Sequence, residues 1–179
     1  MITIISGTNR RNSATHRFAQ HYHRLFQELT DEPVHLFSLA DLPDDILHVD
    51  MYDPGTQSKA LAKIQDERIL PAEKFFFLLP EYNGGMPGAL KLFIDALSVR
   101  EYAKTFKGKK AALTGVASGR QGNLRGMDHL TGVLLHMGTQ VLPNRLPISS
   151  IKGLHDENGT LNAETEQVMR RQVEEFVAW

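Results

Sequence analysis

The chain has 179 residues, enough for one domain whose core buries most of its apolar surface and is stable without disulfide cross-links. It contains no cysteine, which excludes disulfides, thiolate catalysis and thiolate metal sites. Its 20 Lys and Arg balance 21 Asp and Glu, so the formal net charge is -1 and no overall field attracts nucleic acid or an anionic membrane.

The start of the chain and its apolar runs bear on where the protein works. Residues 1–6 already have the composition of a strand, so we expect no signal peptide before the fold. The longest apolar runs are too short to span a bilayer. We therefore expect a cytoplasmic protein with no membrane or nucleic-acid partner, in which residues 1–179 form a single domain.

The first half of the chain is expected to alternate strands and helices. Short β-branched or apolar runs predict strands over residues 2–6, 34–37 and 75–79. A helix after the first strand is indicated by an apolar stripe at helical spacing, formed by Phe18, Tyr22, Leu25 and Leu29. A second helix is expected over residues 56–69. The third strand is apolar throughout, which is typical of a parallel strand covered on both faces.

The second half continues the same alternation. Helices are predicted over residues 87–98 and 124–137, and strands over residues 109–117 and 139–142. Gly138 fits the position that ends a helix, since glycine adopts the left-handed conformation easily. Five strands therefore alternate with helices along this chain.

Two polar segments of the second half have expectations of their own. The basic turn at residues 107–110 is expected to be solvated. After a turn-rich stretch that extends to Thr160, Asn162 is expected to cap a last helix. Glu164 and Glu166 complement the positive end of that helix.

This alternation predicts a doubly wound, three-layer α/β domain with a parallel sheet. In such a sheet the loops after strands one, three and four share one edge, and that edge lines the ligand crevice. These three loops are also the most ligand-like segments of the sequence. They are therefore the candidate site.

The first loop, residues 7–15, combines hydroxyl groups, arginines and the free amides of the helix that follows. Such a helix start favours negative charge, and an arginine adds a charge-assisted fork, so a dianionic phosphate monoester is its natural guest. A capped helix start with solvated arginines accounts for the same residues equally well. The loop has neither a Walker triplet nor the GxGxxG dinucleotide fingerprint.

The second loop follows the buried strand 75–79, makes a wide glycine-rich turn and restarts as a helix at Pro87, which suits a helix's first turn. It offers one carboxylate, one phenol and one amide, from Glu81, Tyr82 and Asn83. Its glycines let the backbone approach a flat ring closely, which indicates a planar cofactor. The alternative is a plain connection with Glu81 and Tyr82 at the surface.

The third loop, residues 118–123, is again small and polar. By itself it is a weak signal, because its two glycines can simply make a turn. It is a candidate part of the site because the predicted fold places it beside the other two loops.

Together the three loops resemble the NADPH-dependent FMN reductase family. The family's first motif, Gly-Ser/Thr-x-Arg-x-x-Ser, is matched by Gly7, Thr8, Arg10 and Ser13. Its second motif, Pro-Glu-Tyr-Asn followed by Pro-Gly-x-Leu-Lys and Ile-Asp, is matched by Pro80, Glu81, Tyr82, Asn83, Pro87, Gly88, Leu90, Lys91, Ile94 and Asp95. The third loop departs from the family's usual Gly-Gly with a following Arg-Ala, and reads Gly122-Asn123-Leu124-Arg125-Gly126.

The resemblance implies a flavodoxin-like fold with a five-stranded parallel sheet in the order 2-1-3-4-5, and FMN and NADPH as cofactors. It places the FMN phosphate at hydroxyl, guanidinium and amide groups of Thr8, Arg10, Ser13, Ala14 and Thr15. It places the isoalloxazine ring along Pro80, Glu81, Tyr82, Asn83 and Gly84, with Ser118 and Gly119 on the other side.

The reaction implied is hydride transfer from NADPH to flavin N5, after which the electrons pass to a small acceptor such as a quinone or free flavin. We expect no essential general acid or base, because the protein's task is to stack two rings with water excluded. Amides of residues 83–85 are expected to stabilise charge on the reduced flavin, and Tyr82 to stack. The resemblance also suggests a homodimer or homotetramer, with residues 100–106 and Trp179 as contact points.

Two other functions stay open at this point. A non-catalytic flavodoxin-like electron carrier would hold FMN without turning over NADPH, although such carriers tend to be strongly acidic and this chain is not. A phosphate-binding module would hold another phosphorylated ligand. The eight histidines form no H-E-x-x-H or carboxylate-histidine cluster, so no metal site is expected.

Overall fold

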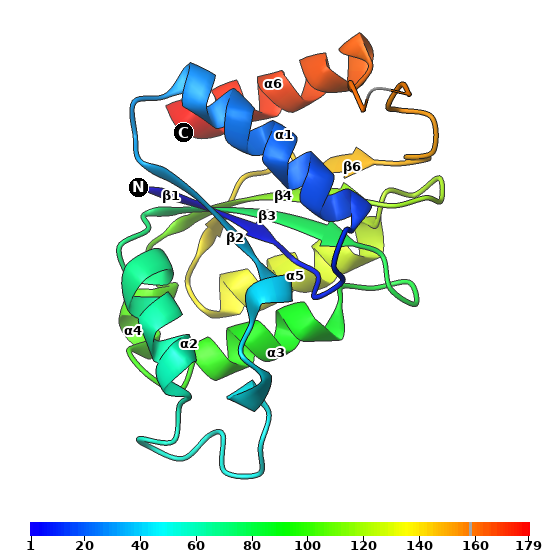
Figure 1. Ribbon diagram of the computed structural model, residues 1–179. Helices are drawn as coiled ribbons and strands as arrows, with labels where there is room; N and C mark the ends of the chain where they lie inside the picture. The colour runs from blue at the N-terminus through cyan, green and yellow to red at the C-terminus, as the bar shows by residue number, and fades with distance from the viewer. Residues whose placement is uncertain (158) are drawn as a thin grey trace.

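A computed structural model describes residues 1–157 and 159–179 and shows a parallel sheet in the order β2-β1-β3-β4-β5, with β6 also paired to β4 (Figure 1). The order is the one expected. The strands are β1 (Ile2–Ser6), β2 (Val34–Ser38), β3 (Lys74–Pro80), β4 (Lys110–Val116), β5 (Gln140–Val141) and β6 (Leu146–Ile148). Every residue of β1 is buried, and so is every residue of β3 after Lys74, as a strand covered on both faces requires.

Helices cover both faces of this sheet (Figure 1). On one face lie α1 (Ala14–Leu29) and α6 (Ala163–Ala178). On the other face lie α2 (Lys59–Ile64), continued by the π-helical turn η3 (Gln65–Ile69), α3 (Gly88–Leu97), α4 (Tyr102–Thr105) and α5 (Leu124–His136). Two short 3-10 turns, η1 (Leu39–Asp41) and η2 (Asp44–Ile46), follow β2. In the part of the chain that the structure describes, none of the helices could cross a membrane.

Each face has its own apolar core. The α1 and α6 side buries Phe18, Tyr22 and Leu25 of the predicted stripe, whereas Leu29 at the end of α1 is only half-buried. On the opposite side, the helices predicted over residues 87–98 and 124–137 also bury apolar residues that recur at helical spacing, namely Leu90, Phe93, Leu97, Met127, Leu130, Leu134 and Met137. Both helical periodicities are therefore confirmed, and Gly138 ends α5 with a φ of 79° as expected.

The helix expected over residues 56–69 starts later and is less regular. It begins at Lys59, because Ser58 caps it by accepting a hydrogen bond from the amide of Leu61. The Thr56 hydroxyl instead donates to the carbonyl oxygens of Asp50 and Asp53 and closes the preceding loop. The last five residues form a π-helical turn rather than an α-helix.

The single strand expected over residues 139–142 is in fact two short pieces. Between them β4 advances from Ala111 to Thr114, whereas its partner advances from Val141 to Leu146. The partner therefore has two residues more than β4 over this stretch (five steps against three) and must leave the ladder. It does so at Pro143, which has no N–H to donate to a sheet. β6 lies in the segment that was expected to be rich in turns, where no strand was predicted.

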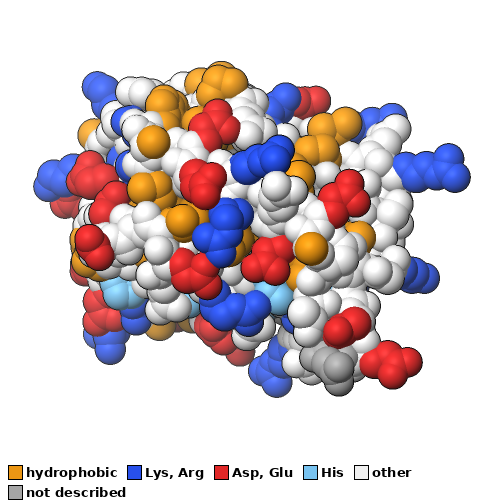
Figure 2. All heavy atoms as spheres, turned by 90° about the horizontal axis from the view of Figure 1, so that it is seen from above, with side chains coloured by type: hydrophobic (Ala, Val, Ile, Leu, Met, Phe, Trp, Pro, Cys, Tyr) orange, Lys and Arg blue, Asp and Glu red, His pale blue; other side chains and the backbone are white. Residues whose placement is uncertain are grey.

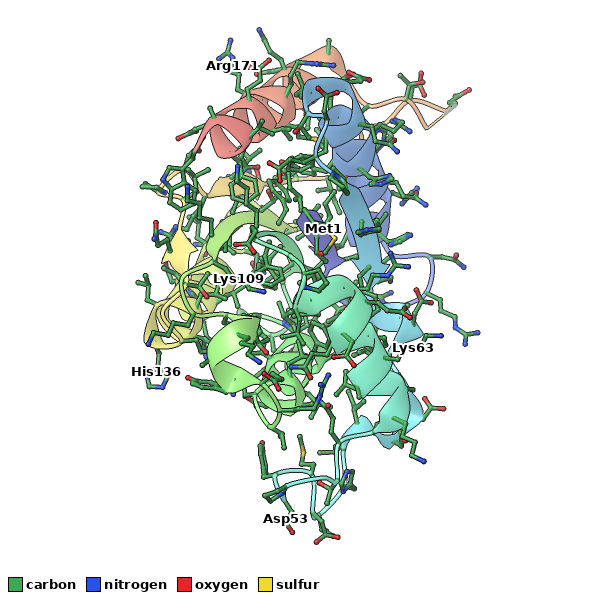
Figure 3. All side chains as sticks on the ribbon, turned by 90° about the vertical axis from the view of Figure 1, so that its left-hand side faces the viewer. Met1, Asp53, Lys63, Lys109, His136 and Arg171 are labelled. Carbon is green, nitrogen blue, oxygen red and sulfur yellow. The ribbon has the colours of Figure 1, made fainter. Side chains whose placement is uncertain are left out.

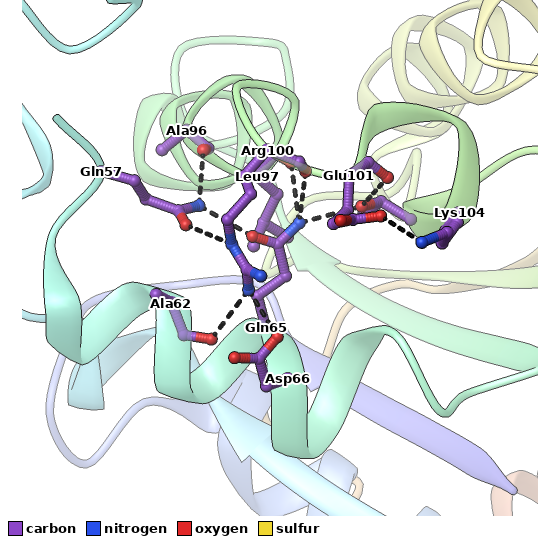
Figure 4. Close-up of polar contacts among 10 residues, drawn as sticks. Gln57, Ala62, Gln65, Asp66, Ala96, Leu97, Arg100, Glu101 and Lys104 are labelled. Carbon is purple, nitrogen blue, oxygen red and sulfur yellow. Dashed lines mark hydrogen bonds and ion pairs between the residues drawn. The ribbon is translucent and has the colours of Figure 1, made fainter. Parts of the chain in front are cut away.

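The turn after α3 is fixed by a buried amide and a salt bridge (Figure 4). Gln65 Nε2 donates to the carbonyl oxygens of Leu97 and Arg100, at 3.0 and 2.8 Å, and to the hydroxyl of Thr105 at 2.9 Å. Arg100 Nη2 lies 2.5 Å from Oδ1 of Asp66. Arg100 is thus engaged within its own chain, and the contact role expected of residues 100–106 stays a prediction.

The expectation of a solvated turn at residues 107–110 is wrong for Lys109, whose side chain lies in the interior (Figure 3). Its Nζ donates to the carbonyl oxygens of Ile69 and Leu70, at 2.9 and 3.0 Å, where the π-helical turn ends. The Ile69 carbonyl also accepts a hydrogen bond from the amide of Ala72 at 3.2 Å. The ammonium also lies 5.3 Å from the centre of the Phe75 ring. Burial lowers the pKa of Lys109 to about 8.

Lys109 should make the stability of the protein pH-dependent in the alkaline range. Because its folded-state pKa of about 8 lies below the ordinary 10.5, the unfolded chain binds more protons between these two values, so this group makes the folded state more stable as pH rises through that window. Urea unfolding at about pH 8 and about pH 10 measures the slope. We expect Lys109→Met to lose this rise, and Lys107→Met, at an exposed position of the same turn, to keep it. Equal slopes in both variants would contradict the assignment.

Candidate active site

The three loops predicted to form the site meet at the carboxyl ends of β1, β3 and β4. Thr8 in the first loop is 1% exposed, and its hydroxyl hydrogen-bonds to the hydroxyl of Tyr82 in the second loop at 2.6 Å. This bond joins segments that are 74 residues apart in sequence. The phenol therefore braces the second loop against the first, which leaves the face of its half-buried ring for a ligand.

A cavity of about 270 Å³ lies between the loops. Its wall contains most of the predicted site residues, namely Arg10, Ser13, Ala14, Thr15, Pro80, Glu81, Tyr82 and Ser118. Thr8 lies behind this wall, bonded to Tyr82. The structure does not bring Asn83, Gly84 or Gly119 to the wall. Four residues that sequence reasoning missed do line it: Asn12, Val116, Ala117 and Ile151.

The α1 end of the cavity has the chemistry of an anion site. Ser13 caps α1 by accepting a hydrogen bond from the amide of His16 at 3.1 Å, so its own hydroxyl proton is left to donate. The amides of Ala14 and Thr15 belong to the first turn, where N–H groups have no partner within the helix. No acidic residue lies in that turn, and Arg10 adds a positive charge. The donors here suit a phosphate monoester.

The second loop is a tight turn rather than the wide one expected. The amide and carbonyl of Tyr82 exchange hydrogen bonds with those of Gly85, both at 3.1 Å. The two residues between them, Asn83 and Gly84, have φ values of 52° and 75°, the signature of a type I′ turn. The Gly85 amide is therefore engaged by Tyr82 and is not free for a ligand, contrary to expectation. The turn leaves the backbone of this loop rigid.

The third loop is held to the second by Asn123, a buried residue with a φ of 62°. Its Nδ2 donates to the carbonyl oxygens of Leu79 and Pro80, at 3.1 and 2.8 Å. Its Oδ1 accepts a hydrogen bond from the amide of Gly126 at 3.1 Å and caps α5. One side chain therefore fixes both the end of β3 and the start of α5. An asparagine just before an apolar helical stripe is a cap signal, and it was available in the sequence.

The last wall of the cavity comes from the segment after β6. The carbonyl of Gly119 accepts a hydrogen bond from the amide of Ser150 at 3.0 Å, and the amide of Ile151 donates to Ala117 at 3.3 Å. These bonds bring Ile151 over the end of β4. The cavity thus combines apolar side chains, among them Val116, Ala117 and Ile151, with cationic and amide donors at one end, which fits a flat ring with a phosphate-bearing tail.

The comparisons with known proteins agree with this geometry. Residues 1–152 match the family described as NADPH-dependent FMN reductase. The NAD(P)H-dependent FMN reductase of Pseudomonas aeruginosa is 33% identical over 115 residues, and this match covers 63% of the chain but only 62% of that protein's length. The quinone reductase of Pseudomonas putida is 27% identical over 184 residues, covering 99% of the chain and 93% of that protein.

Among solved structures, the flavoenzyme NAD(P)H:(acceptor) oxidoreductase FerB from Paracoccus denitrificans superposes with a TM-score of 0.78 at 24% identity, over 99% of this chain and 95% of that one. A likeness at this identity bears on the fold alone. The fold is flavodoxin-like, as the sequence resemblance implies.

Proposed function

The chain belongs to the NADPH-dependent FMN reductase family, and we propose that it moves electrons from NAD(P)H through FMN to a small acceptor of the quinone class. It is an NAD(P)H-dependent flavin oxidoreductase. The observation that carries the proposal is that the start of α1, with its free donors, and Tyr82 line one and the same cavity. FMN, when bound, supplies the hydride-accepting centre of this chemistry.

At the α1 end, the protein's contribution is to hold the phosphate. We assign this role to the Arg10 guanidinium, the Ser13 hydroxyl and the amides of Ala14 and Thr15. Thr8 acts behind them, since its oxygen accepts a hydrogen bond from the amide of Arg10 at 3.2 Å as well as contacting Tyr82. The first loop is therefore shaped by the same hydroxyl that anchors the second.

At the other end, the protein's contribution is to orient a flat ring. We assign the ring-binding site to Pro80, Glu81 and Tyr82 on one side and to Ser118 on the other, with Ile151 closing it. The amides of Asn83 and Gly84 remain as candidate donors to the ring edge, because the Gly85 amide is engaged. Walls that exclude water would favour hydride transfer between a flavin and a nicotinamide bound there, and no proton transfer is assigned to a side chain.

Arg10→Ala should weaken FMN binding by about 1.5–3 kcal/mol, the usual scale for a hydrogen bond to a charged group. Quenching of flavin fluorescence during titration measures the affinity. Arg11→Ala is the matched control, because Arg11 is the adjacent arginine and does not line the cavity. Equal losses in the two variants would mean that general charge, and not a contact from Arg10, attracts the phosphate.

Turnover distinguishes a reductase from an electron carrier with the same cofactor. We expect the FMN-loaded protein to oxidise NADPH continuously when a simple benzoquinone is supplied, followed at the nicotinamide absorbance. A carrier would hold FMN yet give no NADPH oxidation under these conditions. That result would favour the alternative function.

We also propose that the protein acts as a homodimer or homotetramer in the cytoplasm. What supports an assembly is exposed apolar surface on the α3, α4 and α5 side, where Tyr102 is 45% and Leu135 58% exposed. Trp179, expected as another contact point, packs instead against Phe176 of its own chain, with ring centres 6.2 Å apart. Light scattering on the purified protein measures the assembly directly.

A further inference from the structure

A second polar hollow, of about 370 Å³, lies between α1 and the segment that leads into α6. It shares no residue with the proposed flavin cavity. Figure 2 looks onto the face that carries α1 and α6 and shows histidine and basic side chains beside one another there. Its walls include Arg17, His21, Arg24, His155 and Glu166.

Two arginines line this hollow. Arg17 and Arg24 lie seven residues apart on α1, hence on one face of the helix, with His21 between them. Within residues 1–157 and 159–179, neither arginine forms an ion pair, whereas Arg145 and Arg170 each lie 2.5 Å from a carboxylate oxygen. Arg17 and Arg24 thus line the cavity with no described carboxylate at ion-pair distance, although Glu166 belongs to the same wall.

Two histidine side chains, His21 and His155, also line the hollow. The rings of His21 and His155 have centres 5.4 Å apart, although they come from segments distant in sequence. Nη2 of Arg24 donates to Nδ1 of His21, so the proton of a neutral His21 sits on Nε2. Among the described residues, Nε2 of His155 is buried with no hydrogen-bond partner. Both rings therefore have donor capacity that the protein itself does not use.

The charges around the hollow affect the protonation of its two imidazoles. Burial, Arg24 and His155 lower the pKa of His21 to about 4. Burial and Arg17 lower the pKa of His155, and Asp156 acts against them. Both imidazoles are thus kept neutral beside two fixed positive charges. A bound dianion would reverse this preference, because it favours the protonated rings.

We propose that this hollow binds a dianionic oxyanion of the phosphate class, held by the forked guanidinium groups of Arg17 and Arg24 and by donors from His21 and His155. Guanidinium forks match the geometry of such anions, and charge-assisted bonds are the strong ones. Glu166 in the same wall opposes the anion and limits its affinity. Binding draws protons onto the imidazoles, so it tightens as pH falls. The charged groups that face them are Arg17, Arg24, Asp156 and Glu166.

Calorimetric titration of the full-length protein with sulfate tests the proposal. The protein is saturated with FMN beforehand, so that the phosphate end of the flavin cavity is taken. Sulfate is used because it stays doubly charged across the pH range, and sodium chloride holds the ionic strength constant. We expect saturable binding that tightens by about tenfold between about pH 7.5 and pH 5.5, the scale of one charge-assisted hydrogen bond.

Matched variants distinguish sulfate binding in the hollow from attraction by the general positive charge of the surface. Arg17→Gln/Arg24→Gln should weaken sulfate binding about tenfold or more. Arg171→Gln, at an exposed position of α6 outside the hollow (Figure 3), should leave it unchanged. Glu166→Gln should tighten it, and His21→Gln should reduce its pH dependence. Sulfate affinity that is unaffected by the double arginine variant, or no saturable binding at all, would overturn the proposal.

Two further arms identify the source of the phosphate, since the same chemistry occurs free and in NADPH. Inorganic phosphate, added to the protein in the presence of sulfate, should displace the sulfate from the hollow if a free anion is the ligand. If the hollow serves the extra phosphate of NADPH, the double arginine variant should weaken the binding of NADP+ but not of NAD+, measured by the same calorimetric titration. Either result supports the site, and neither depends on whether NADPH reduces the flavin.

Discussion

Gly115→Ala is expected to destabilise the protein by more than about 3 kcal/mol and to abolish flavin binding, because overpacking a well-packed interior costs 1–3 kcal/mol and here the misfit is larger than usual. A Cβ on Gly115 would lie 1.9 Å from the carbonyl oxygen of Gly122. Gly115 sits in β4 between β3 and β6, so the strand cannot move aside. The third loop cannot retreat either, since the backbone of Gly122 lies against Pro147.

Urea unfolding and flavin titration measure the two effects. Gly132→Ala is a control with the same chemical change, because Gly132 lies inside α5 with open space around the added Cβ. That substitution should stabilise the protein by about 0.5–1 kcal/mol, the cost of glycine within a helix. A Gly115→Ala protein as stable as the wild type would show that the third loop is not pressed against β4.

Asn123→Ala should cost about 2–4 kcal/mol of stability and weaken FMN binding, because it removes three hydrogen bonds of a buried side chain, two to carbonyl oxygens and one from an amide. The carbonyl oxygens of Leu79 and Pro80 lie where β3 passes into the loop that carries Tyr82. Losing the Asn123 donor should therefore make the ring-binding site less ordered as well as make the fold less stable. Chemical unfolding and flavin titration again provide the two readouts.

Two variants show which of the three hydrogen bonds matters. Asn162→Ala removes an N-cap only, at α6, and should cost about 1 kcal/mol. Asn123→Asp keeps an acceptor for the amide of Gly126 but turns a carboxylate oxygen toward two carbonyl oxygens, so it should be at least as damaging as alanine. If Asn123→Ala cost no more than Asn162→Ala, the bridge to β3 would contribute nothing.

The central strands and the long helices were predictable because their signals are local. The apolar run of β3 and the apolar stripe of α1 each appear within one segment of sequence. The edge strand was not predictable in the same way, because its two pieces are short and Pro143 interrupts them. Lys109 was misplaced because its partners, Ile69 and Leu70, are about 40 residues earlier, and no local pattern shows that a lysine will satisfy them.

The site was predictable to the extent that topology defines it. Parallel strands bring the loops of Arg10, Tyr82 and Ser118 to one edge whatever their side chains do, and the family motif supplied the chemistry. Ile151 was missed because it reaches the cavity only through backbone bonds that form after β6 has paired. The engagement of Gly85 was missed because glycine residues allow both a wide and a tight turn, and only the observed φ values decide between them.

Anaerobic addition of NADPH to the FMN-loaded protein, followed by visible absorbance, tests the central claim most directly. One equivalent of NADPH delivers two electrons, so we predict stoichiometric loss of the oxidised flavin band and its return on adding a benzoquinone. A flavin band that NADPH leaves intact, while dithionite bleaches it, would contradict the account and identify a flavin carrier instead.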